Sequence, residues 1–397
     1  YNIDVLICQN ILCIISINSV STVVYLGGTI YFSVYSYIDF SIFNFQLQVR
    51  YPSRKSHVRR QRAIPSSVPF PCEDALSWGR SPQRPTSVHR LRPGDIDVVA
   101  AIGDSLVAGS GALEEFALGA FVEYRGVSWC AGGDATWREY LTLPNILKEF
   151  NPNLRGYSTG TGEWLTRNAK FNVAFPVASD EDALKQAKII VARMRAATDI
   201  DIANDWKMVT VFIGANDLCS ASCLNPVSWS PAAHAKKLSI ALDYLQKHLP
   251  RTIVNLVPVL GETIRMAVEN LSYSLKCFTD GGAGRYDTSD DFTVIVQPFM
   301  RLFNAPLPPT SPLPLVIHQS YITHDCFHFS QKGHALAANL LWNNLLEPIG
   351  NKTDNVPPIL LRSFRCPSRR APFLFTYKNS RSYMITGKQD GADDVFL

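Results

Sequence analysis

Short apolar runs alternate with amphipathic segments along the middle of the chain, from about residue 95 to residue 350. The runs are rich in β-branched side chains and end at Gly, Asn, Asp or Pro, which is typical of buried strands. We expect strands at 96–102, 127–130, 171–175, 207–213, 252–257 and 292–297. Between them, apolar residues three and four apart predict helices over 144–150, 181–197, 231–248 and 331–346.

This alternation predicts an α/β fold with a mostly parallel sheet, because parallel strands need a crossover segment between them. The near-continuous apolar runs further indicate that helices cover both faces of the sheet. In folds of this kind, ligands bind at the carboxyl ends of the strands. We therefore expect the functional residues to lie where a predicted strand ends.

The chain changes composition outside the alternating region. Residues 1–49 are largely apolar, and the stretch from Ile3 to Ile38, with Asp4 as its one charge, is long enough to span a bilayer. Residues 50–94 are basic and rich in Pro and Ser, which indicates a linker and an extended lead-in. We expect the folded domain at 95–365 and a C-terminal tail at 366–397.

Three interpretations of the apolar segment stay open. The segment could be a signal-anchor, a leader removed at Arg59-Arg60-Gln61-Arg62, or sequence unrelated to the domain that follows. The basic tract after it would place the domain in the cytosol by the positive-inside rule. Large domains often override that rule, so the basic tract does not decide the compartment.

The composition indicates a globular protein and argues against nucleic-acid binding. Of the 397 residues, 46% are hydrophobic and 18% are charged, so the chain can bury a sizeable core. The formal net charge is +4, and the tract from Arg50 to Arg62 contains six Lys or Arg and no acid. Because the remainder is nearly neutral, the basic footprint of a nucleic-acid-binding protein is missing.

Cysteines and sequons favour an oxidising compartment. The chain has nine cysteines, and Cys219 and Cys223 lie close together without a second pair at zinc-binding spacing. We therefore expect no metal site, and disulfides among Cys219, Cys223, Cys277 and Cys326. N-glycosylation sequons begin at Asn270 and Asn351. Together these features predict a protein that is secreted or faces the extracellular side of a membrane.

The strongest chemical candidate is Ser105, in Gly103-Asp104-Ser105-Leu106, where the first strand meets a glycine-rich turn. A serine at such a junction can present its hydroxyl to the crevice at the sheet edge. Gly, Asp and Ser also gather at strand ends for turn formation alone, so this segment by itself decides nothing.

Three later strand ends could complete a site around Ser105. A backbone N–H in Asn172–Ala178 and the side-chain amide of Asn216 could face a developing oxyanion. In Asp325-Cys326-Phe327-His328, the aspartate can reach back to the imidazole and leave its other nitrogen free for a serine proton. His324 and His328 also have helical metal-pair spacing, but they precede the predicted helix and lack the glutamate of a zinc-protease motif.

Taken in order, these residues resemble the GDSL (SGNH) hydrolase superfamily, and more closely its membrane-associated phospholipase B branch. The resemblance covers about Phe70 to Asn379. It rests on the strand-end segments above and on Tyr124-Arg125-Gly126-Val127-Ser128-Trp129, Gly132-Gly133-Asp134, Leu143-Pro144-Asn145-Ile146-Leu147, Asp205-Trp206-Lys207, Gly284-Arg285-Tyr286-Asp287-Thr288 and Trp342-Asn343-Asn344.

The resemblance implies a three-layer SGNH-type sandwich and a residue set. Ser105 would be the nucleophile, His328 the general base, and Asp325 the residue that orients His328. The oxyanion donors would be the Ser105 N–H, the Val177 N–H and the Asn216 side chain. The family carries glycine where this chain has Val177, which narrows the available backbone conformations; Gly133 is the alternative donor.

The same resemblance implies a serine esterase that hydrolyses acyl esters of phospholipids and lysophospholipids at a membrane surface, without a cofactor. One alternative is a carboxylesterase acting on short-chain or carbohydrate esters, favoured by a region between Asn270 and Gly284 that is shorter than in the family. Another is a lipid-binding protein without turnover on the same fold, for which Val177 is the supporting feature.

Overall fold

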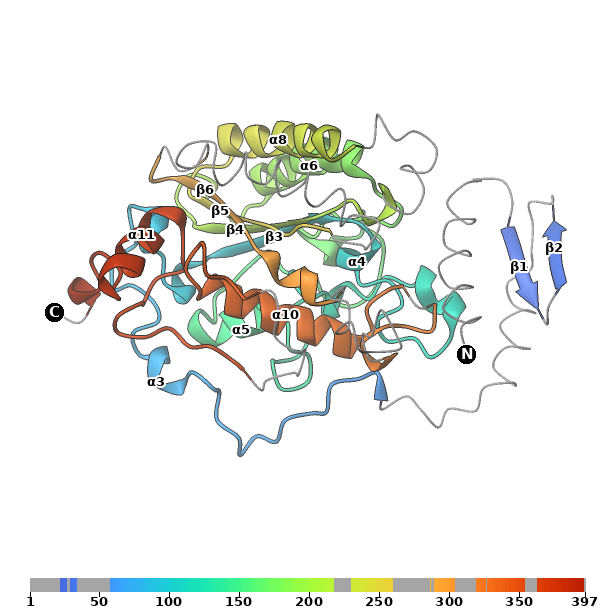
Figure 1. Cartoon of the computed structure of the whole chain (residues 1–397), viewed down its shortest axis with the longest axis horizontal. Helices are drawn as coiled ribbons and strands as arrows, with labels where there is room; N and C mark the ends of the chain where they lie inside the picture. Colours follow the sequence, from blue (N-terminus) through green and yellow to red (C-terminus); the bar gives the residue numbers. More distant parts are fainter. Residues whose placement is uncertain are drawn as a thin grey trace, which may run out of the picture.

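The computed structural model describes residues 22–26, 29–33, 58–217, 230–259, 286, 289–303, 319–325, 327–353 and 363–395. Its centre is a parallel sheet of four strands in the order β3-β4-β5-β6 (Figure 1). The strands are β3 Val98–Gly103, β4 Lys207–Phe212, β5 Thr252–Leu256 and β6 Phe292–Val296. The α/β fold and these four predicted strands are confirmed.

Helices cover both faces of the sheet (Figure 1). Helices α6 (Ala183–Ala196) and α8 (Pro231–His248) lie on one face, and α5 (Leu143–Phe150) and α10 (Gln331–Leu345) lie on the other. Along β3, Val98, Ala100 and Ile102 pack in the core under α6 and α8, whereas Val99 and Ala101 pack in the core under α5 and α10. Both sides of the strand are buried, which is why its sequence is apolar throughout.

Shorter helices connect or flank these elements. They are α3 Glu73–Leu76, α4 Ser105–Ala108 and α11 Tyr377–Thr386, with 3-10 helices at Val88–Arg90, Pro93–Asp95, Ala117–Phe121, Arg125–Val127, Arg167–Ala169, Asp180–Asp182, Pro298–Phe303, Gln319–Tyr321 and Asp393–Val395.

The predicted strand at 127–130 is wrong. The segment forms local turns, in which the Ser128 N–H donates to Arg125 O at 3.1 Å and the Gly132 N–H donates to Ser128 O at 2.8 Å. Trp129 and Cys130 are nevertheless fully buried, with exposed fractions of 0% and 1%. The apolar run therefore reflects a turn packed into the core, which a period-two pattern cannot separate from a short strand.

The predicted strand at 171–175 is reduced to one bridge, between Asn172 and Ala101. The guanidinium of Arg125, which is itself 0% exposed, donates to the carbonyls of Asn172 and Ala174 at 3.1 and 2.7 Å. The next rung of the ladder would use the N–H and O of Gly103, but the Gln186 side chain bonds both, at 2.9 and 2.8 Å. Pro176 follows at once and cannot donate to a ladder, so the strand ends there.

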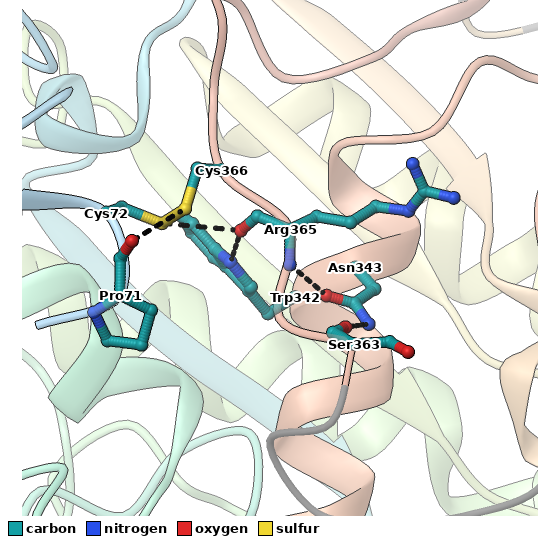
Figure 2. Close-up of a disulfide and its surroundings, with 7 residues drawn as sticks. All are labelled: Pro71, Cys72, Trp342, Asn343, Ser363, Arg365 and Cys366. Carbon is teal, nitrogen blue, oxygen red and sulfur yellow. Dashed lines mark hydrogen bonds between the residues drawn. A yellow bond between two sulfur atoms is a disulfide. The ribbon is translucent and has the colours of Figure 1, made fainter. Parts of the chain in front are cut away.

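A disulfide joins the segments before and after the central domain. Cys72 and Cys366 are bonded with Sγ atoms 2.07 Å apart, beside Trp342 of α10 (Figure 2). The Trp342 indole donates to Arg365 O at 2.7 Å. This pair was not among the predicted disulfide cysteines, all of which lie outside the described residues; among the described cysteines, Cys130 is free and buried.

Other contacts bind both ends of the described domain to its core. The Asn379 amide, on α11, donates to His89 O at 2.9 Å. In the basic segment, Gln61 is 8% exposed and its amide donates to Trp137 O at 3.1 Å. Much of residues 58–94 and 363–395 is thus packed against the domain.

The apolar N-terminal segment contains two described strands, β1 Thr22–Leu26 and β2 Thr29–Ser33, which pair antiparallel. Among the described residues, no helix combines the length and the apolar character needed to cross a membrane.

Candidate active site

Ser105 lies where β3 passes into α4. Gly103 ends the strand, and a Cβ there would lie 2.4 Å from a methyl of Val107, so only glycine fits. Asp104 caps α4 by accepting the Leu106 N–H at 2.9 Å, and Gly109 ends the helix with a φ of +81°. This strand-to-helix corner holds Ser105, which is 5% exposed, at the carboxyl edge of the sheet.

Asp325 and His328 form a hydrogen-bonded pair before α10. The Nδ1 atom of His328 lies 2.5 Å from Asp325 Oδ2, while Asp325 Oδ1 accepts the N–H groups of Phe327 and His328 at 3.0 and 3.1 Å. Burial acts to raise the pKa of Asp325, but hydrogen bonds from His328 and from the Thr323 hydroxyl outweigh it and lower that pKa to about 2. An ionised carboxylate can only accept, so Nδ1 carries the proton and Nε2 is the basic nitrogen.

Two contacts bring this pair beside the turn that follows Ser105. The Gln331 N–H donates to Ala112 O at 2.8 Å, and a Thr323 methyl lies 3.5 Å from the Cβ position of Gly111. The hydrogen bonds among the described residues do not include one between the Ser105 hydroxyl and the His328 ring. In unliganded hydrolases such bonds are often long and tighten when substrate binds.

Asp104, the cap of α4, shares its surroundings with His328. Burial raises the pKa of Asp104 to about 6, opposed by the Leu106 N–H and by the nearby His328.

Val177 lies in a tight turn formed by Phe175-Pro176-Val177-Ala178. The Ala178 N–H donates to Phe175 O at 3.3 Å, and Val177 has a φ of +64°. Proline at the second position and a positive φ at the third define a type II turn, whose third position favours glycine. Val177 keeps the glycine-like backbone conformation, and its side chain is 71% exposed.

Asn216 follows β4 and contacts the same loop. Its side-chain amide donates to Ala178 O at 2.9 Å. The Gly133 N–H donates to Ser158 O at 2.8 Å, so it is used within its own loop and does not serve as the alternative oxyanion donor. The structure therefore brings Asn216 and Val177 to one place at the sheet edge.

A buried charged cluster, which the sequence did not reveal, lies behind this loop. Asp180 lies 3.0 Å from His234 Nδ1 and 2.8 Å from Lys237 Nζ, and its N–H donates to Asp217 Oδ2 at 3.0 Å. Burial and the neighbouring charge of Asp180 raise the pKa of Asp217 to about 8. The four residues come from three segments that are far apart in sequence, so no spacing could reveal the cluster.

Two groups of side chains could be considered as metal sites, the cluster around Asp180 and the pair His324 and His328, but their contacts do not favour a bound metal ion. Ligand atoms of Asp180, Asp217 and His234 lie within 4.8 Å of one another, but Lys237 already supplies a positive charge to Asp180. The His324 ring lies 3.2 Å from the Arg59 guanidinium, a poor neighbour for a cation.

The sequence matches one protein family and several known proteins. A model of the GDSL-like Lipase/Acylhydrolase family matches residues 99–341. The chain is 42% identical over 335 residues to "Phospholipase B1, membrane-associated" of Homo sapiens, and 39% identical over 333 residues to the protein of that name from Mus musculus. Each match covers 75% of this chain but 22% of the relative, so the chain spans less than a quarter of the length of these proteins.

Proposed function

Because the chain belongs to the GDSL-like lipase/acylhydrolase family, we propose that it is a serine esterase acting on phospholipids and lysophospholipids. The family membership rests on a match that includes the corner at Ser105 and reaches into α10. The lipid substrate is inferred from the relatives, which are named phospholipases. The match covers only part of the length of those proteins.

The observation that carries the proposal is the Asp325–His328 pair beside the Ser105 corner. A carboxylate whose pKa lies near 2 is ionised at neutral pH and fixes the His328 tautomer. The imidazole is then oriented to accept a proton at Nε2, which is the function of a general base in acyl transfer. Ser105, at the N-terminus of α4, is the hydroxyl that we assign as the proton donor to His328.

In the proposed reaction, Ser105 Oγ attacks the ester carbonyl while His328 takes its proton. The tetrahedral oxyanion is stabilised by the N–H groups of Ser105 and Val177 and by the Asn216 amide. His328 then protonates the leaving alcohol, and water releases the fatty acid from the acyl-enzyme. All of these steps use protein groups and water, so the mechanism needs no cofactor.

A non-catalytic lipid-binding protein is the second candidate, and one observation favours it. Val177 is a β-branched residue with a φ of +64°, in a turn that favours glycine and that would supply an oxyanion donor. The hydrogen-bonded Asp325–His328 pair, which a protein without turnover would not need, supports the esterase instead.

We also propose that the protein is secreted or exposed on the extracellular side of a membrane. The Cys72–Cys366 disulfide supports this, because structural disulfides persist in oxidising compartments. Asn351, the first residue of one sequon, is exposed after α10 and is accessible for glycosylation. The other sequon, at Asn270, lies outside the described residues.

Hydrolysis of phosphatidylcholine and lysophosphatidylcholine tests the proposal. The parent protein is compared with Ser105→Ala and with Ser110→Ala, a matched control on the same turn whose buried hydroxyl makes no hydrogen bond within the described structure. Fatty acid released by the parent and the control, but not by Ser105→Ala, is the expected result. Activity that survives in Ser105→Ala would exclude Ser105 as the nucleophile, and turnover of a short-chain ester alone would favour the carboxylesterase alternative.

A further inference from the structure

The oxyanion loop, residues 175–180, is attached to the end of β4 by two hydrogen bonds. The Asn216 amide donates to Ala178 O at 2.9 Å, and the Asp180 N–H donates to Asp217 Oδ2 at 3.0 Å. The two bonds lie on either side of Ser179, directly after the type II turn that carries Val177. They fix the turn relative to the strand end from which Asn216 projects.

Asp180 also connects this loop to helix α8. Its carboxylate is 0% exposed and lies 3.0 Å from His234 Nδ1 and 2.8 Å from Lys237 Nζ. On the other side, the His234 ring packs against the segment that follows β4, where a Cβ at Gly214 would lie 2.8 Å from the ring. Asp180 is thus the point at which the oxyanion loop, the β4 end and α8 meet.

We propose that Asp180 is a positioning residue for ester hydrolysis, which holds the Val177 N–H and the Asn216 amide in a fixed relation to each other. This inference rests on the oxyanion roles proposed above. Asp180 does not contact the reacting atoms, because its carboxylate is used by His234 and Lys237. It acts through the loop, since a displacement of about 1 Å in a positioned group can cost on the order of 100-fold in rate.

The test uses Asp180→Asn, which keeps the size of the side chain and one acceptor oxygen, and Asp180→Ala, which keeps neither. Asp199→Asn is the matched control, because it removes the same charge from an exposed residue just beyond α6. We expect kcat for a soluble short-chain ester to fall about 10-fold in Asp180→Asn and about 100-fold in Asp180→Ala. KM should stay within about twofold, since an oxyanion hole acts in the transition state.

A double-mutant cycle with Asn216→Ala separates positioning from general damage to the fold. If Asp180 acts through the oxyanion hole, Asp180→Ala should cost much less in the Asn216→Ala background than alone. Additive losses, or a change in KM without a change in kcat, would overturn the inference.

Hydrogen exchange makes the structural part of the inference testable without activity. Amides of residues 175–180 should exchange faster in both Asp180 variants than in the parent and the Asp199→Asn control. Unchanged exchange there would overturn the inference, whether or not the protein hydrolyses esters. An inactive parent with faster exchange in the variants would instead refute the esterase proposal and leave the anchoring role of Asp180 intact.

Discussion

Replacing Val177 by glycine should stabilise the protein and raise its activity. A residue other than glycine in the left-handed region costs about 1–2 kcal/mol, and a β-branched side chain lies at the upper end. The Val177 side chain is 71% exposed, so its removal sacrifices little buried area. Glycine adds about 0.5–1 kcal/mol of backbone entropy loss on folding, which, with the small loss of buried area, leaves a net gain of about 1 kcal/mol.

Thermal unfolding and ester hydrolysis measure the two consequences of Val177→Gly. A gain of this size in a domain of this length corresponds to an increase in unfolding temperature of about 1–3 °C. We expect kcat to increase a few-fold, because a relaxed turn can align the N–H at position 177 with less distortion. Val177→Ala is the control, since it keeps a Cβ at the strained φ and removes only the branching.

The comparison of the two variants decides whether strain is the cause. If backbone strain at position 177 is the cause, Val177→Gly is more stable than Val177→Ala. A glycine variant that unfolds at a lower temperature than the alanine variant would refute it. That result would mean that the exposed valine makes contacts that outweigh its unfavourable backbone conformation.

Three further predictions concern stability and pH. Reduction of the Cys72–Cys366 disulfide, or replacement of both cysteines by alanine, should lower the free energy of unfolding by up to about 5–6 kcal/mol if the bond acts through loop entropy, because it joins residues 294 positions apart. An unchanged unfolding temperature under reductant would contradict this prediction. Asp325, whose pKa is lowered to about 2, contributes stability that is present above its unfolded pKa and lost as pH falls from about 4 to 2. The free energy of unfolding of Asp325→Asn should therefore fall less steeply with pH in that window than that of the parent. The kcat of this variant should fall at least 100-fold. Asp217 has a raised pKa, so its contribution to the free energy of unfolding is greatest at low pH and declines as pH rises towards 8. Asp217→Asn should therefore unfold at a higher temperature than the parent at pH 9 but not at pH 4. Equal changes in unfolding temperature at the two pH values would count against a buried, protonated Asp217.

The sequence was most informative where burial dictates composition. Each strand of the sheet is covered on both faces, so β3 and β4 appear as apolar runs, and the amphipathic helices α6 and α8 appear through their spacing. The same signal failed at Trp129 and Cys130, because a turn buried in the core has the same composition as a buried strand.

Features that depend on distant residues could not be predicted. The partner of Cys72 is settled by how the C-terminal segment packs along α10, and nothing in the cysteine spacing indicates it. The Asp180 cluster combines residues from a loop, a strand end and a helix. By contrast, Asp325 and His328 were recognisable because a three-residue separation before a helix lets the carboxylate reach the ring.

Covalent labelling with a fluorophosphonate probe tests the central claim, that Ser105 is activated by His328. The parent protein is treated with the probe, digested and examined by mass spectrometry beside a His328→Gln variant. The account predicts one modified peptide, with the adduct on Ser105, and at least a 100-fold slower reaction in the variant. An adduct on another serine, or labelling of Ser105 at the same rate without His328, would contradict it.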